Sequence, residues 1–128
     1  MSYLTRLSCT VCGQIFPADV PQTYCAACKA PLLTHYDLAS ARNNLDRDGF
    51  SHRPAGMWRW QELLPLQQPA LISSLGEGDT PLLSLPRMGI DLDIPNLYLK
   101  DESRNPTGSF KARGLSAAIS KARELGIS

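Results

Sequence analysis

The sequence predicts a small four-cysteine ribbon, a helical connector and the start of an α/β domain whose parallel sheet is incomplete. Three observations lead to this fold class. Four cysteines lie in two close pairs near the N-terminus, a tract rich in proline and glutamine interrupts the middle, and short strands followed by a helix close the chain. We place the boundaries at residues 1–36, 37–69 and 70–128.

The composition is that of an ordinary globular chain. The 128 residues are 43% hydrophobic with a formal net charge of +1, a balance that gives no electrostatic footprint for nucleic acid. No apolar run approaches the ~18 residues that cross a bilayer. The N-terminus lacks the apolar core of a secretory signal and the Arg-rich character of a transit peptide. We therefore expect a cytoplasmic protein without membrane or nucleic-acid partners.

The two cysteine pairs have the spacing of a metal site. Cys9 and Cys12 form one C-x-x-C, Cys25 and Cys28 form a second, and 12 residues separate the pairs. Each pair is expected to form a tight knuckle that directs two thiolates at one metal, so two knuckles give a tetrahedral site. Short apolar runs at residues 3–7, 14–16 and 32–36 would form the hairpins of a zinc ribbon.

We expect the four cysteines to hold a structural zinc ion, because about 35 residues bury too little apolar surface to fold without one. Disulfides and a redox dithiol are the alternatives, and a cytosolic setting disfavours disulfides. Four thiolates leave no position for water or substrate, so the metal would not be catalytic. Neither His35 nor His52 has the spacing of an alternative ligand, and both are expected to be surface or packing residues.

The connector is expected to contain two short helices. Asp37 can cap a first helix that runs to Leu45, and residues 46–49 form a turn. A second helix over residues 57–64 stops at Pro65. Its tryptophans, Trp58 and Trp60, are expected to pack this arm onto the following domain. A ligand platform is the alternative, but residues two apart on a helix do not share a face.

After the boundary, the segment GEGDTPLL (residues 76–83) makes an irregular loop that leads into a strand. A lone G-x-G is weak evidence for phosphate binding, and we assign no chemical role to any of its residues. Residues 82–86 and 96–100 are expected to be strands. Lys100, at the end of the second, is expected to be solvated.

The last helix carries the most informative lysine. Asn-Pro and Thr-Gly turns precede helix formers at residues 115–125, and Gly126 is expected to cap the end. Lys111 falls in the first turn, on an apolar stripe with Leu115, Ala118, Ala122 and Leu125, while Arg113, Ser116, Ser120, Arg123 and Glu124 point the opposite way. Burial and the helix dipole would lower the pKa of such a lysine and allow Schiff-base formation. The alternative is a lysine that extends to solvent.

The string LYLKDESRNPTGSFKARG resembles the cofactor-lysine segment of the fold-type II pyridoxal-phosphate (PLP) enzymes. This family contains the threonine synthases, the threonine and serine dehydratases and cysteine synthase. GEGDTPLL resembles the segment that opens the catalytic domain of threonine synthases, some of which also carry a cysteine ribbon. By this resemblance Lys111 binds the cofactor PLP as a Schiff base.

The resemblance also implies a reaction. A threonine synthase is a lyase of threonine biosynthesis that converts O-phospho-L-homoserine and water to L-threonine and phosphate, and its full-length form is expected to be a homo-oligomer. Ala112 stands where many threonine synthases have aspartate, which leaves open a dehydratase-like or β-replacement enzyme. A stand-alone zinc-ribbon binding module is a further alternative. No basic residue lies between Cys9 and Cys28, so such a module would hold nucleic acid poorly.

One part of a PLP site has no match in the sequence. The cofactor's phosphate needs a cradle of backbone amides, usually a run of glycines at a helix N-terminus. The nine glycines are never adjacent. We therefore expect the chain to be the N-terminal portion of a larger enzyme and to be inactive alone.

Overall fold

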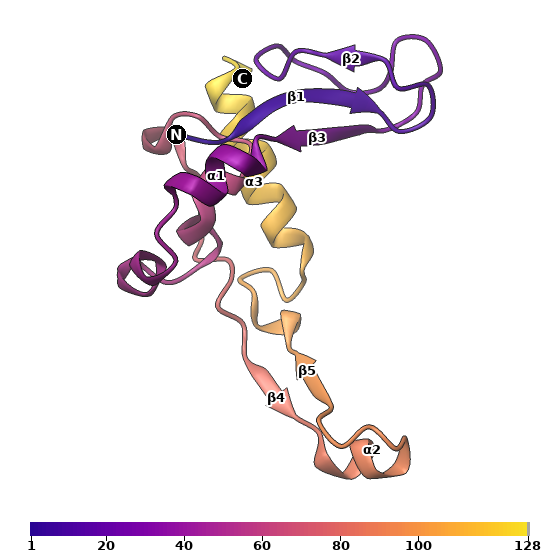
Figure 1. The fold of residues 1–128 in the computed structure, drawn as a ribbon, viewed down its shortest axis with the longest axis vertical. Helices are drawn as coiled ribbons and strands as arrows, with labels where there is room; N and C mark the ends of the chain where they lie inside the picture. Colours follow the sequence, from indigo (N-terminus) through magenta and orange to yellow (C-terminus); the bar gives the residue numbers. More distant parts are fainter. Residues whose placement is uncertain (128) are drawn as a thin grey trace.

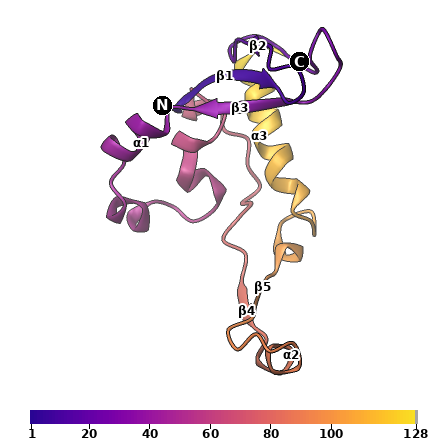
Figure 2. The same ribbon diagram turned by 45° about the vertical axis from the view of Figure 1, so that its right-hand side comes forward.

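The computed structural model describes residues 1–127, which form an elongated molecule. A three-stranded sheet lies at one end, the helix α3 (Lys111–Glu124) runs away from it, and a β-hairpin projects at the other end (Figure 1). Turning the molecule by 45° leaves the hairpin projecting in the same way (Figure 2). Among the described residues no helix is long and apolar enough to cross a membrane.

The ribbon has the expected strands. The central strand β1 (Leu4–Cys9) pairs antiparallel with β2 (Ile15–Phe16) and with β3 (Leu32–Tyr36), in the order β2-β1-β3. Its small core consists of Cys9, Phe16 and Cys25. Two of these three buried residues are thiols, so the ribbon has almost no apolar interior of its own.

The connector begins with α1 (Leu38–Asn44), whose expected cap is confirmed. Asp37 accepts hydrogen bonds from the backbone N–H of Ser40 at 2.9 Å and from its hydroxyl at 2.6 Å. A 3₁₀ helix (Asp48–His52) follows in place of a simple turn.

The second connector helix differs from the prediction. Residues Met57–Leu63 form 3₁₀ turns with a kink at Trp60, whose φ of −103° and ψ of 28° are not helical. The two tryptophans have different partners. The indole N–H of Trp58 donates to the Ser116 hydroxyl at 2.9 Å, and the Trp60 ring lies 4.5 Å from that of Phe50. Trp58 thus docks the connector onto α3, as expected for packing. A further 3₁₀ turn (Pro69–Leu71) leads out of the connector.

The prediction of a parallel sheet is wrong. β4 (Leu82–Ser84) and β5 (Tyr98–Lys100) pair antiparallel, with Leu83 opposite Leu99. Between them lies α2 (Pro86–Asp91), which the sequence did not indicate. A parallel partner requires the chain to return along the first strand. Six helical residues span only about 9 Å, so the chain turns back at the same end and forms a hairpin.

α3 ends as predicted. Gly126 has a φ of +69°, its N–H donates to the Arg123 carbonyl, and the N–H of Ile127 donates to the Ala122 carbonyl. These two bonds define a Schellman motif, which needs a residue in the left-handed conformation and therefore favours glycine. A last 3₁₀ turn (Glu102–Arg104) joins β5 to the loop before α3.

Candidate metal centre and candidate cofactor lysine

The four cysteines come together at one end of the ribbon. Their sulfur atoms all lie within 4.8 Å of one another. Cys9 Sγ is 3.3 Å from Cys28 Sγ, and Cys12 Sγ is 3.5 Å from Cys25 Sγ. These distances are too long for disulfides, whose sulfurs are ~2.05 Å apart. They match the edges of a small tetrahedron with metal–sulfur bonds of ~2.3 Å. The donor set therefore fits a closed four-thiolate metal site.

Backbone N–H groups favour the thiolate at one cysteine of each knuckle. The N–H groups of Val11 and Cys12 both donate to Cys9 Sγ at 3.4 Å. The bond from Cys12 is the larger cause that lowers the pKa of Cys9 to about 6. In the second knuckle the backbone N–H of Cys28 likewise lowers the pKa of Cys25. His35 takes no part, since its Nε2 lies 2.6 Å from the Ser8 hydroxyl, and neither histidine joins the cluster within residues 1–127.

Lys111 begins α3, as predicted, but its surroundings differ from the prediction. The N-terminal part of the stripe expected to be buried is open, since Lys111 and Ala118 are exposed and Leu115 is 56% exposed, while Ala122 and Leu125 are half-buried. An open hollow of about 510 Å³ is lined by Phe110, Lys111, Arg113, Gly114 and Leu115, with the Lys111 ammonium 5.9 Å from the centre of the Phe110 ring. The lysine is therefore accessible in a largely apolar hollow.

The polar stripe of α3 is the face that packs. Ser116 is 4% exposed and Ser120 is fully buried. The Ser116 hydroxyl donates to the Ser73 carbonyl at 2.7 Å, and the Ser73 N–H donates to the Ser120 hydroxyl at 2.8 Å. At the C-terminal end, the Glu124 carboxylate accepts from the backbone N–H groups of Gln67 and Gln68. Hydrogen bonds thus dock this face of the helix on Ser73 and on the connector.

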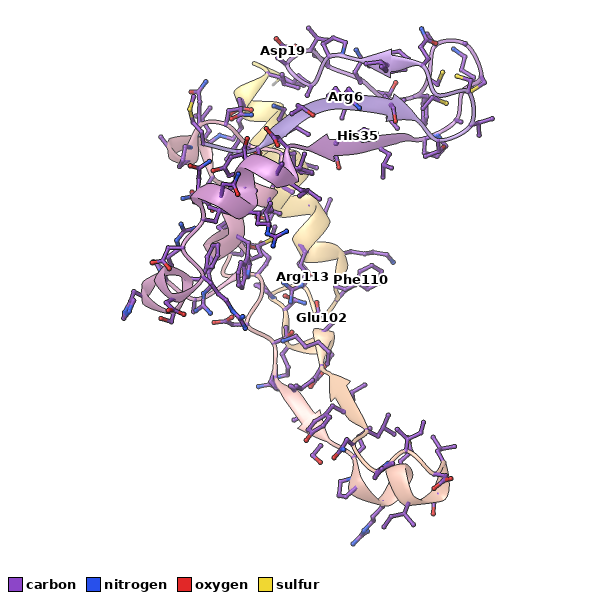
Figure 3. The ribbon with its side chains drawn as sticks, in the orientation of Figure 1. Arg6, Asp19, His35, Glu102, Phe110 and Arg113 are labelled. Carbon is purple, nitrogen blue, oxygen red and sulfur yellow. The ribbon has the colours of Figure 1, made fainter. Side chains whose placement is uncertain are left out.

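A second polar cluster holds the N-terminal end of α3. The Arg113 guanidinium donates two hydrogen bonds to the Glu102 carboxylate, from Nε at 2.7 Å and from Nη2 at 2.8 Å. Thr80 and Asn105, each no more than 5% exposed, also donate to this carboxylate. The Gly78 N–H donates to Asn105 Oδ1 at 3.1 Å. Figure 3 shows Arg113 directed at Glu102, with Phe110 on the other side of the chain. We call Glu102, Arg113, Thr80 and Asn105 the Glu102 cluster.

The Glu102 cluster was not predicted from the sequence. Its members come from the GEGDTP loop, the turn after β5 and α3, and no periodic pattern relates the three segments. The chemistry of the side chains was the one signal that could have indicated the cluster. Acidic and amide side chains in tight loops beside an arginine-bearing helix need partners once they are buried.

Glu102 should make folding sensitive to acid. The hydrogen bonds from Arg113, then those from Thr80 and Asn105, hold the pKa of Glu102 far below its usual range. A carboxylate whose pKa is lower in the folded than in the unfolded state stabilises the fold above the unfolded value of about 4.3, and this contribution is lost as pH falls. In the metal-free chain, we expect Glu102→Gln to flatten the decline in unfolding free energy between pH 5 and 3, measured by urea titration with circular dichroism. Identical slopes would contradict this assignment.

These features are consistent with the comparisons. Residues 73–127 match the family model of the pyridoxal-phosphate dependent enzymes. The particular relatives are threonine synthases. The chain is 36% identical over 119 residues to the threonine synthase of Methanocaldococcus jannaschii and 34% identical over 122 residues to that of Methanosarcina acetivorans. These alignments cover 93% and 95% of the chain. The resemblance stated from the sequence is confirmed.

Shorter alignments are found with other threonine synthases. The threonine synthase of Halalkalibacterium halodurans is 42% identical over 67 residues, which is 52% of the chain. The chain spans 29% of the length of each of the two archaeal relatives. No solved structure matches the chain.

Proposed function

We propose that the chain acts as part of a PLP-dependent threonine synthase, a lyase of threonine biosynthesis that converts O-phospho-L-homoserine and water to L-threonine and phosphate. The observation that carries the proposal is Lys111, which opens α3 at the edge of an apolar hollow within the family-matched segment. Bound there, PLP would supply an electron sink for the substrate's carbanions. The Lys111 amine would anchor the cofactor and carry protons.

The described residues fit one part of the cofactor. Lys111 offers the primary amine, and its hollow is lined mainly by apolar surface. Within residues 1–127 we find no run of glycine amides at a helix N-terminus that suits the phosphate. The rest of the cofactor site must come from other residues, so we expect the 128 residues alone to be inactive.

Ala112 bears less on substrate choice than the sequence implied. Its side chain is 2% exposed on the docked side of α3, about one-quarter turn from Lys111. A residue in that position affects how the helix packs before it affects a ligand in the Lys111 hollow. The argument for a dehydratase-like or β-replacement enzyme is correspondingly weaker, and the threonine synthase reaction remains our proposal.

We further propose that Cys9, Cys12, Cys25 and Cys28 bind zinc in a structural role. Support comes from the donor set, four thiols with sulfur atoms within 4.8 Å, which suits a tetrahedral zinc ion and leaves no open position. The proposed setting is the cytoplasm, with a small amino-acid substrate and no nucleic-acid or membrane partner.

A chimaera tests the proposed function. The chain replaces the matched 119-residue segment of the Methanocaldococcus jannaschii relative, and phosphate release from O-phospho-L-homoserine is measured. Borohydride reduction followed by peptide mass spectrometry locates covalently attached PLP. We expect turnover and attachment at Lys111. Lys111→Ala should remove the attachment and lower turnover by about 10³-fold or more.

The matched control is Lys100→Ala, since Lys100 is the nearest rival lysine and its ammonium donates to the Thr80 carbonyl. This variant should keep PLP on residue 111. Attachment and turnover that survive Lys111→Ala but disappear with Lys100→Ala would show that the wrong lysine was chosen.

A further inference from the structure

The first turn of α3 lacks the usual stabilising features of a helix N-terminus. The N-cap position is Phe110, which makes no side-chain capping bond, and no acidic residue lies in the first turn. Helices normally satisfy their first N–H groups with a Ser, Thr, Asp or Asn cap. Here the Lys111 N–H donates to the Ser109 hydroxyl at 3.3 Å, and the N–H groups of Ala112 and Arg113 donate to the Ser109 and Phe110 carbonyls at 3.2 Å. These bonds all lie within residues 109–113, so they do not fix the direction of the turn relative to the rest of the chain.

Arg113 fixes that direction from the opposite side of the helix. Two residues correspond to a rotation of about 200°, so Arg113 and Lys111 project in nearly opposite directions. The two parallel bonds from Arg113 to Glu102, 2.7 and 2.8 Å long, fix the direction of the guanidinium. When one side of a helix is fixed in this way, the direction of the other side is fixed as well.

Glu102 is itself held in place. The Thr80 hydroxyl donates to one carboxylate oxygen, and the Asn105 amide donates to the other at 2.9 Å. The Asn105 amide also donates to the Glu102 carbonyl at 3.0 Å. Through Gly78, the cluster is tied to the loop that packs on the connector. Arg113 therefore binds an acceptor that cannot easily follow it if the helix turns.

We propose that Arg113, held by Glu102, is a positioning residue that sets the direction of Lys111 towards its hollow. This inference rests on the proposed role of Lys111 as the cofactor lysine. The other docking bonds of α3, at Ser116, Ser120 and Glu124, lie further along the helix and hold its middle and end. Loss of the two hydrogen bonds from Arg113 to Glu102 should loosen the first turn and leave the rest of α3 docked.

Hydrogen exchange of the complete 128-residue chain tests this difference between the two ends. The variants are Arg113→Gln and Arg113→Lys. The lysine keeps the positive charge but cannot make the paired hydrogen bonds to Glu102. We expect the amides of residues 114–116 to exchange about tenfold faster and those of residues 121–124 to stay within about twofold. A purely global loss of stability would accelerate both ends by the same factor. Equal acceleration, or none, would overturn the inference.

The matched control is Arg123→Gln, which removes a cation from the same helix. Arg123 is exposed and donates one long bond, 3.4 Å, to the Leu71 carbonyl. First-turn exchange should stay at the wild-type rate in this variant. Acceleration there as large as in Arg113→Gln would show that loss of any positive charge on α3 has the same effect.

The chimaera gives a second readout. We expect Arg113→Lys to retain PLP attached at Lys111, to lower kcat about tenfold or more and to change KM by less than about threefold. An unchanged kcat would overturn the inference. If the wild-type chimaera fails to attach PLP at Lys111, the proposed function fails, while the exchange ratio still decides whether Arg113 orders the first turn.

Discussion

Removal of the proposed zinc ion by a strong chelator should unfold residues 1–36 and leave α3 in place. The ribbon's buried core is Cys9, Phe16 and Cys25, so two of its three members are proposed metal ligands. Without the metal, one phenylalanine cannot offset the conformational entropy of a ribbon of this size. Structural zinc sites in small domains contribute apparent free energies of about 10–16 kcal/mol at pH 7.

α3 should stay folded and docked because its hydrogen-bond partners lie outside the ribbon. In the described part of the chain its docking hydrogen bonds go to the connector, to Ser73 and to the Glu102 cluster, and none goes to residues 1–36. The measurement is amide NMR before and after chelation, with metal content verified. Cys25→Ser should reproduce the loss of ribbon signals. Val11→Ser, a change at a 76% exposed position between two ligands, should not. Ribbon signals that persist after verified metal loss would refute the metal assignment.

Replacement of Gly78 by alanine should destabilise the chain by on the order of 3–5 kcal/mol. Gly78 has a φ of +104°, which L-residues rarely adopt. A Cβ there would lie 2.5 Å from the Met57 backbone nitrogen and 2.9 Å from the Gly56 carbonyl carbon. Both neighbours are backbone atoms in a hydrogen-bonded loop, where the Met57 N–H donates to the Glu77 carbonyl at 2.7 Å. The clash therefore cannot be relieved by a rotamer change.

Gly114 is the matched control for this substitution. It lies inside α3, and a Cβ there would meet nothing within 4 Å. Gly114→Ala should therefore stabilise the helix by about 0.5–1 kcal/mol, because alanine loses less backbone entropy in a helix. Urea unfolding followed by circular dichroism gives both values. A Gly78→Ala variant as stable as the wild type would show that the GEGDTP loop does not pack tightly on the connector.

The features that local sequence determines were predicted correctly. The two C-x-x-C pairs bring four thiols together because each knuckle is a short turn, and the Asp37 cap and the Gly126 C-terminal motif each involve residues within a few positions. The start of α3 at Lys111 followed from the turn residues just before it. In each case the stabilising partner is close in the sequence.

The errors arose where the partner is distant. Periodicity divided α3 into an apolar and a polar stripe but did not show which of them packs. Ser116 is satisfied by Trp58, 58 positions earlier, and by Ser73, 43 positions earlier. The hairpin of β4 and β5 was read as parallel because an α/β pattern implies crossovers, and the short α2 between the strands escaped notice. The Glu102 cluster combines three separate segments and has no local pattern.

The polar docking of α3 affects how the chain responds to temperature. Exposure of apolar surface raises the heat capacity on unfolding, whereas exposure of polar surface lowers it. The face of α3 that packs is formed mainly by Ser116, Ser120 and hydrogen-bonding charged groups, with Ala112 as its small apolar member. The α3 side of this contact therefore adds little to the heat-capacity change on release of the helix. The strength of the docking should show less curvature with temperature than an apolar core of the same size would.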